Sequence, residues 1–473
     1  MSTNTMTTTQ KVEVTDELVR FARSTAFETL PDTIVEVSKR NVIDALACAF
    51  AGTRSDRGEI STRVATRLGG PAEASVIGTG AKIACVNAAF ANSELMNALD
   101  YDATPHSPPN IVPPLLAAAE MRGASGRELI TSLAVAHETA WRLYSAMSSF
   151  MSSYVEKGTS PTVFGNSNEA VLGAAFGAGR MFGLDPARLA NAVGLTAYFC
   201  SLPVGKDWHT TPPPKPMVKY APTGWLSKAA LTAVLLAEEG MTGHGAVLDS
   251  EYGFWRFYGA ARWDPDSVLD GLGERWVSGA YHFKPYPCCR FFHSQIDCFL
   301  SLLRESELQP EEIESVESLS MPFAANPDQM SVSTQSDAQF SLPYNLAVAA
   351  YGIPVGPQWQ ALETRQDPRI RAFMKKVSFG VHPQAQRTKA EDPRSWLASV
   401  TLKARGRTYT SEVRYARGTP VPGYALSEQE MTAKFVDSAQ LCIGREQALR
   451  AVERLWQLEK IDNVAEIMGE IAP

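Results

Sequence analysis

Apolar residues at helical spacing run through residues 15–270, and this pattern most restricts the fold. Ser125-Gly-Arg-Glu128 has the form of a helix-capping box, and the residues after it place one apolar face every three or four positions: Leu129, Leu133, Ala136, Ala140 and Leu143. Asp185-Pro186 supplies the N-cap and first position of another helix. A further helical run, 226–239, stops at Gly240. With no strand-period segment interrupting it, this half predicts a large all-helical domain.

The pattern changes beyond Trp276, where prolines become frequent. Two alternating segments, 400–404 and 409–413, flank Arg405-Gly-Arg407 and predict a β-hairpin. After Pro422 the spacing is helical again, beginning at the capping box Ser427-Glu-Gln-Glu430. We therefore predict a mainly α protein. Residues 1–279 and 419–473 form the helical domain, and residues 280–418 form a smaller α+β lid domain inserted before the C-terminal helical return.

Composition narrows the class of protein. The 473 residues carry 44 basic and 51 acidic side chains, a formal net charge of −7, without a basic stripe that would bind nucleic acid. No apolar run approaches the roughly 20 residues that cross a bilayer, so we expect no membrane partner. The polar N-terminal tail lacks the features of a signal peptide, and the seven cysteines show no CxxC spacing. These features favour reduced thiols in a cytoplasmic enzyme.

Residues 97–110 concentrate groups that can do acid–base chemistry. Asp100, Asp102, Thr104 and His106 lie on a stretch that Pro105, Pro108 and Pro109 should keep from being helical. We therefore expect an irregular loop between helices, where catalytic groups are often placed.

Five blocks in order resemble the MmgE/PrpD family. They are Asn41-Val-Ile-Asp-Ala-Leu46, the stretch 97–120 around Asp100 and His106, the run 224–243, Lys284-Pro-Tyr-Pro-Cys288, and Phe340-Ser-Leu-Pro-Tyr344. The family includes 2-methylcitrate dehydratase and cis-aconitate decarboxylase. The resemblance implies a helical domain with an α+β lid, an active site in the cleft between them, no cofactor or metal, and a homodimer.

The resemblance also assigns roles to single residues. His106 would transfer protons, with Asp100 and Thr104 beside it in the site. Lys219 and Lys284 would bind substrate carboxylates, and Tyr344 from the lid would assist a leaving hydroxide. On chemistry alone, lysines neutralise carboxylates and developing enolates, and histidine transfers protons near neutral pH. Structural alternatives remain open: His106 as a helix cap, Asp100 as a turn residue, the two lysines as solvated surface groups, and Tyr344 as a packing residue.

Three positions depart from the family pattern. Asp102 is followed by Ala103, where the family has a second acid. His106 is followed by Ser107-Pro108-Pro109, where the family has proline and glycine. Ser160 stands where the family carries a site histidine, which argues against the usual tricarboxylate substrates. We hypothesise that His209, on the proline-rich segment 206–215, supplies the missing imidazole; the alternative is an exposed loop.

A metal site is not expected. The grouped residues His282, Cys288, Cys289, His293 and Cys298 lack zinc-ligand spacing, and no relay that would activate Cys289 is visible.

The function predicted from these residues is a cofactor-independent lyase acting on a small carboxylate. We favour a dehydratase. His106 or Asp100 would remove a proton α to a carboxylate, and Tyr344 or Thr104 would help hydroxide depart. Decarboxylation of a cis-aconitate-like acid, or epimerisation, would use the same anionic intermediate. A catalytically degenerate family member that only binds its ligand is the alternative from another class.

Overall fold

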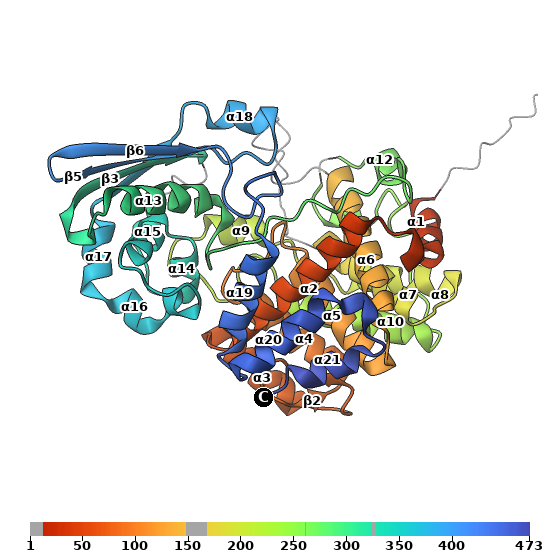
Figure 1. Ribbon diagram of the computed structural model, residues 1–473. Coiled ribbons are helices and arrows are strands. Elements are labelled where there is room, and N and C mark those ends of the chain that lie inside the picture. Colours follow the sequence, from red (N-terminus) through yellow and green to blue (C-terminus); the bar gives the residue numbers. More distant parts are fainter. Residues whose placement is uncertain (1–12, 148–167, 261, 323–326) are drawn as a thin grey trace, which may run out of the picture.

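The computed structural model describes residues 13–147, 168–260, 262–322 and 327–473. The fold is mainly α, as predicted (Figure 1). Its first half is a series of helices: α1 (Val14–Ser24), α2 (Asp32–Gly52), α3 (Asp56–Leu68), α4 (Cys85–Asn97), α5 (Pro108–Arg122), α6 (Gly126–Ala146), α7 (Asn168–Met181), α8 (Pro186–Tyr198), α9 (Gly205–Thr210), α10 (Thr223–Glu238), α11 (Phe254–Phe257) and α12 (Pro265–Leu269). Within the described residues, no helix is long and apolar enough to cross a bilayer.

Most of the predicted helix ends are confirmed. The side chains of Ser125 and Asp185 accept backbone N–H groups at the starts of α6 and α8. Gly240 follows α10 with φ +98°, a conformation that glycine adopts without steric cost. One expectation was wrong: the helical half contains a short antiparallel pair, β1 (Ala74–Ser75) with β2 (Lys82–Ile83). Strands of two residues are too short to leave an alternating pattern in the sequence.

The second half contains a four-stranded sheet in the order β4-β3-β5-β6. The predicted hairpin is confirmed, because β5 (Ala398–Ala404) pairs antiparallel with β6 (Arg407–Val413). Arg405 and Gly406 both have positive φ, which matches the twist of a two-residue hairpin. Strand β3 (Ile313–Ser320) pairs antiparallel with β5 and parallel with β4 (Val377–Val381).

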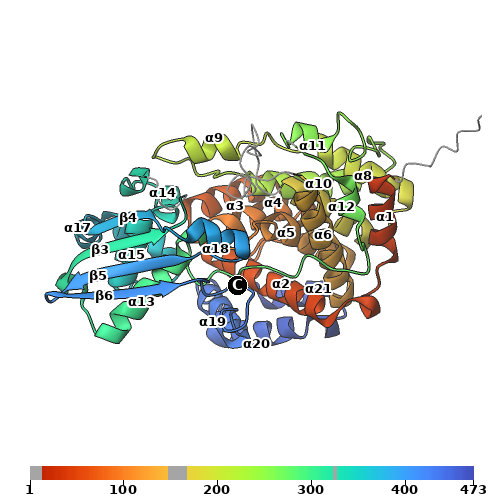
Figure 2. The same ribbon diagram turned by 90° about the horizontal axis from the view of Figure 1, so that it is seen from above.

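Helix α13 (His293–Ser306) packs on one face of this sheet, and later helices return to the first half. The sheet is accompanied by α13, α14 (Gln335–Gln339), α15 (Leu342–Ala350), α16 (Leu362–Gln366), α17 (Pro368–Met374) and α18 (Ala385–Glu391). The chain ends in α19 (Glu428–Ala439), α20 (Arg445–Trp456) and α21 (Val464–Glu470). Figures 1 and 2 show the sheet and its helices to one side of the helical body.

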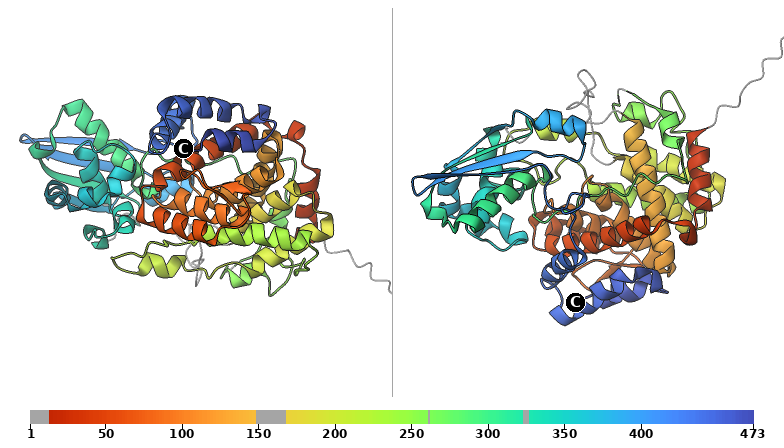
Figure 3. Two further views of the ribbon diagram at one scale, coloured as in Figure 1. Left: turned by 90° about the horizontal axis from the view of Figure 1, so that it is seen from below. Right: turned by 45° about the horizontal axis from the view of Figure 1, so that its top comes forward.

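Two separate hydrophobic cores accompany this arrangement. The larger draws buried residues from α1 to α10 and again from α19 to α21. The smaller lies between residues 286 and 404. Figure 3 shows the C-terminal helices, in blue, against the red and orange helices of the first half, and α19 contacts α2. The domain limits at 279/280 and 418/419 stay a prediction.

Candidate active site

The loop between α4 and α5 carries the acid–base groups predicted for it. It is shorter than expected, because α5 begins at Pro108 and places Pro108 and Pro109 in its first turn. Proline is tolerated there, since the first N–H groups of a helix have no intrahelical acceptor. Pro113, further along, cannot donate to the carbonyl of Pro109. The hydroxyls of Ser93 and Ser227 donate to that carbonyl instead, which ties α5 to α4 and α10.

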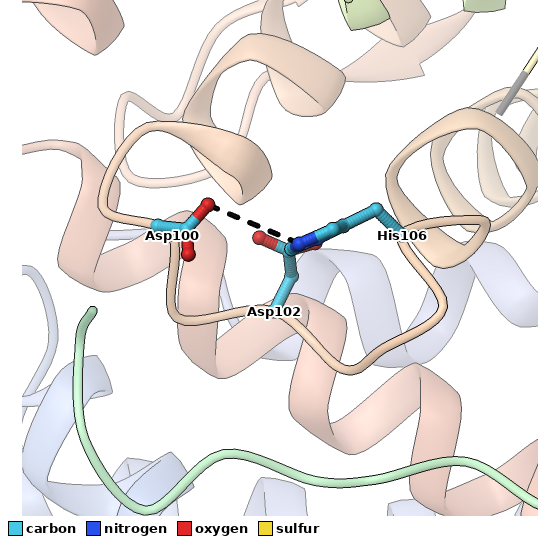
Figure 4. Close-up of side chains that lie close together, drawn as sticks. All are labelled: Asp100, Asp102 and His106. Carbon is cyan, nitrogen blue, oxygen red and sulfur yellow. Dashed lines mark hydrogen bonds and ion pairs between the residues drawn. The ribbon is translucent and has the colours of Figure 1, made fainter. Parts of the chain in front are cut away.

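Asp102 and His106 form a hydrogen-bonded pair in this loop. Figure 4 shows both carboxylates of the loop converging on the imidazole. Oδ2 of Asp102 lies 2.6 Å from Nδ1 of His106, and Asp102 is fully buried. An ionised carboxylate only accepts, so the proton of this bond belongs to Nδ1 and Nε2 is left for chemistry. Nε2 lies 4.0 Å from Oδ1 of Asp100, and the His106 side chain is 18% exposed.

Asp100 binds both predicted lysines. Nζ of Lys219 donates to Oδ1 at 2.9 Å, and Nζ of Lys284 donates to Oδ2 and to the backbone carbonyl, both at 2.6 Å. The hydroxyl of Tyr220 is a further donor to Oδ1, at 3.0 Å. All four residues are buried. Asp100 and Lys219 both have φ +55°, a conformation that is uncommon outside glycine and is found at functional sites.

The ion pairs decide the protonation of Asp100 and Asp102. Burial alone would raise the pKa of the Asp100 carboxyl, but Lys219, Lys284 and His106 hold that pKa well below its usual range. His106 has the same effect on the pKa of Asp102, against burial. Burial raises the pKa of the Tyr220 phenol, and Asp100 raises it further. Asp100 is therefore held ionised, which makes it a weak base, and Tyr220 stays protonated.

The charges of these groups favour an anionic ligand. When His106 carries its second proton, the Asp102–His106 pair is neutral. The ammonium groups of Lys219 and Lys284 against the one carboxylate of Asp100 then leave a net charge of +1 in a largely buried place. A carboxylate of a substrate would balance that charge.

Helix α19 supports the loop from behind. Nζ of Lys434 donates to Oδ1 of Asp44 at 2.7 Å and to the carbonyls of Tyr101 at 2.9 Å and Lys284 at 3.0 Å. The other carboxylate oxygen of Asp44 accepts the N–H of Ala103 at 3.1 Å. This pair fixes the loop and the Lys284 backbone in one arrangement.

The sheet-bearing half reaches the same loop through two glutamines. Nε2 of Gln339 donates to the carbonyl of Ala98, and Nε2 of Gln360 donates to the carbonyl of Leu99, each at 2.8 Å. These carbonyls immediately precede Asp100, so the site lies where the two halves meet.

His209 is close to the pair, although its segment differs from the loop that we expected. It lies in the short helix α9, not in an irregular loop. Its ring stacks on Tyr220 with centroids 6.0 Å apart and an interplanar angle of 6°. The Tyr220 ring in turn lies 5.3 Å from that of His106. Burial and Lys215 lower the pKa of His209 to about 4.

Other predicted residues are placed differently. Thr104 is half-buried and pairs through its backbone with His282. Tyr344 lies in the smaller core, where its hydroxyl donates to the carbonyl of Trp359 at 2.6 Å. The structure thus brings Tyr220, not Tyr344, to Asp100. Ser160 lies outside the described residues.

Several site residues were not among those predicted. Asp102 was noticed in the sequence but given no role, although its spacing of four from His106 was a usable signal. Tyr220 follows Lys219 directly, and only the positive φ of Lys219 explains why both reach one carboxylate. Asn97 lies only five residues before Asp102, at the end of α4, and was given no role. Arg57 and Lys434 come from helices distant in sequence, which no local pattern indicates.

The donor atoms of Asp100, Asp102 and His106 lie within 4.8 Å of one another, as in many metal sites. This is the one such group among the described residues, and no residue of the segment around Cys288 belongs to it. The oxygens of Asp100 already carry two ammonium groups, which would repel a divalent cation. The residues therefore fit an organic anion better than a metal.

Known proteins match most of the chain. A model of the MmgE/PrpD N-terminal domain matches residues 16–265, and one of the MmgE/PrpD C-terminal domain matches residues 286–458. Cis-aconitate decarboxylase from Aspergillus terreus is 28% identical over 312 residues, 62% of this chain and 60% of that protein, so the match spans less than two thirds of the fungal relative. The proteins of that name from Mus musculus and Homo sapiens are each 24% identical over 91% of this chain and 88% and 89% of their own lengths.

Proposed function

The chain belongs to the MmgE/PrpD family, and on that premise we propose that it is a cofactor-independent lyase that decarboxylates a small unsaturated polycarboxylate. The observation that carries the proposal is the Asp102–His106 pair, whose Nε2 lies 4.0 Å from the Asp100 carboxylate that binds the two ammonium groups. Relatives named cis-aconitate decarboxylase support the same reaction class.

The chemistry needs one proton and one place for negative charge. The bond between the leaving carboxylate and its carbon breaks, and its electron pair forms a new double bond. The former double bond moves its electrons toward the remaining carboxylate as a dienolate. Lys219 and Lys284 stabilise that charge across Asp100, and Nε2 of His106 protonates carbon while Asp102 stabilises the imidazolium. Carbon dioxide leaves, and the product keeps the proton.

Dehydration, which the residues first suggested, remains the alternative. It needs an acid for the departing hydroxide, and Tyr344 or Thr104 was expected in that role. The Tyr344 hydroxyl is bound to the carbonyl of Trp359 in the smaller core, so this alternative would have to use Thr104 or the protonated Tyr220 for that step. Decarboxylation needs no acid for a leaving hydroxide, so it requires fewer of the groups present. Epimerisation would return the proton to the other face of the same anion.

Proton NMR in D₂O tests the proposal. The purified protein is incubated with cis-aconitate, citrate, 2-methylcitrate and tartrate-type acids. We expect a product that has lost one carboxylate carbon and gained one deuterium. New vinyl signals with all carboxylates retained would replace decarboxylation by dehydration, and deuterium in an unchanged acid would indicate epimerisation. Thermal stabilisation without any product would support the degenerate, ligand-binding alternative.

His209 is proposed to take part in substrate recognition in place of the histidine that Ser160 replaces. We expect His209→Ala to raise KM about tenfold, which corresponds to about 1.4 kcal/mol of lost binding. The matched control is His244→Ala, since His244 is exposed and outside the site. Steady-state kinetics on the best acid of the panel measures both. Unchanged kinetics in His209→Ala would end the recognition role.

We also propose a cytoplasmic homodimer. Apolar side chains lie exposed between residues 198 and 225: Tyr198 at 70%, Leu202 at 71%, Met217 at 48%, Val218 at 44% and Trp225 at 52%. Such exposure supports an interface between copies of the chain. All seven cysteines are free, which supports a reducing compartment. Light scattering coupled to size exclusion would separate the dimer from a monomer of 51.4 kDa.

A further inference from the structure

A chain of buried hydrogen bonds continues behind the Asp102–His106 pair. Nδ2 of Asn97, the last residue of α4, donates to Oδ1 of Asp102 at 3.2 Å. Oδ1 of Asn97 accepts from a guanidinium N–H of Arg57 at 3.2 Å. Arg57 is paired through Nε with Glu94, and another of its nitrogens donates to the hydroxyl of Thr223 at 3.3 Å.

The partners of Asn97 fix the orientation of its amide. Arginine can only donate and an ionised aspartate can only accept, so the oxygen must face Arg57 and the nitrogen must face Asp102. Asn97 is fully buried, and water cannot substitute for either partner without entering the core. Both oxygens of Asp102 are then engaged, one by Asn97 and one by His106. The carboxylate cannot rotate away from the imidazole without breaking the bond to Asn97.

We propose that Asn97 is a positioning residue for proton transfer: held by Arg57, it locks the Asp102 carboxylate in the orientation that keeps the His106 proton on Nδ1 and Nε2 free. The kinetic test of this role rests on the proposed function, because it needs turnover of a substrate. The NMR test does not, because the tautomer of His106 can be measured without any substrate. A residue that fixes the tautomer can have a large effect on the rate, because the wrong imidazole tautomer in a histidine–aspartate pair can lower kcat about 10⁴-fold.

Asn97→Asp tests this role sharply. The new carboxylate still accepts from Arg57, but it cannot donate to Asp102 and places a like charge against it. Repulsion between the two carboxylates should turn Asp102 away from His106. Asn92→Asp is the matched control on the same helix. Asn92 is also buried, accepts from the N–H of Ile77 and donates to the carbonyl of Ser75, so it loses one donor without touching the site.

Nitrogen-15 NMR of the chain labelled in its seven histidines reports the tautomer of His106, with the signal assigned by its loss in His106→Asn. The charged and polar groups facing this imidazole are Asp100, Asp102, Lys219, Lys284, Tyr220 and His209. We expect the Nδ1–H signal in the wild type and in Asn92→Asp, and its loss in Asn97→Asp. In turnover, we expect kcat to fall at least about tenfold in Asn97→Asp with KM changed less than about threefold.

The outcomes separate the two proposals. If no acid is turned over but the tautomer changes only in Asn97→Asp, the positioning role stands and the proposed function fails. An unchanged Nδ1–H signal and unchanged kcat in Asn97→Asp would overturn the positioning role. If the paired carboxylates prevent folding, Asn97→Ala removes the same donor without adding charge, and retention of the wild-type tautomer there would overturn the role equally.

Discussion

Replacing His106 with asparagine should lower kcat by about 10²–10⁴-fold, the usual contribution of a single general acid or base. The asparagine amide can still donate to Oδ2 of Asp102, which His106 contacts at 2.6 Å through Nδ1. The loop and the buried carboxylate therefore keep a partner. What the variant loses is Nε2, the only atom of the pair that can deliver a proton to substrate. Steady-state turnover of the acid identified by NMR measures the effect.

His244→Asn provides the matched control, because that histidine is exposed and outside the site. It should retain wild-type kcat and KM. Circular dichroism and thermal unfolding of both variants separate lost chemistry from lost structure. A His106→Asn variant that folds and keeps more than about a tenth of wild-type kcat would exclude His106 as the proton-transfer group. Lys219, whose pKa is lowered by burial, would then be the next candidate.

The fold could be predicted from the sequence to the extent that local chemistry determines it. Capping residues such as Asp185 and Ser427, and the Arg405-Gly406 turn, satisfy backbone groups within a few residues, so their patterns are readable in one dimension. Pro108 shows the limit of such rules. It marks the end of the preceding loop and equally the first turn of a helix, and the sequence does not distinguish these two uses.

The site could be predicted only in part, for a physical reason. Asp100, His106, Lys219 and Lys284 were found by resemblance to family motifs, and the structure brings all four together. The role of Asp100 as a base stays a prediction. The sequence did not indicate that both lysines would bind this one carboxylate, because they lie 119 and 184 residues away from it. The bonds from Lys434 to Tyr101 and from Arg57 to Asn97 likewise join segments far apart in the sequence. Charge balance in a buried site is a property of the folded chain rather than of any motif.

That charge balance gives the second large effect, which is on stability. Lys284→Met should lower the free energy of unfolding at pH 7 by about 3–5 kcal/mol, the usual cost of removing one partner of a buried ion pair. Nζ of Lys284 donates twice to Asp100, and both residues are buried, so the variant leaves a carboxylate with one ammonium group inside the protein. Urea unfolding followed by circular dichroism measures the difference.

The pH dependence identifies the carboxylate responsible. Lys219, Lys284 and His106 lower the pKa of Asp100 on folding, against burial, so their stabilisation is complete above about pH 4, where an unfolded aspartate titrates, and declines as the pH falls further. The stability difference between the wild type and Lys284→Met should therefore shrink below about pH 4.

Asp100→Asn combined with Lys284→Met should lower the free energy of unfolding by less than the sum of the single variants, because the two groups interact directly. Arg405→Met breaks an exposed pair with Glu312 and should leave the unfolding midpoint nearly unchanged. A Lys284→Met variant as stable as that control would mean that the buried pair adds no net stability, and Lys284 would then be retained for its charge in the site alone.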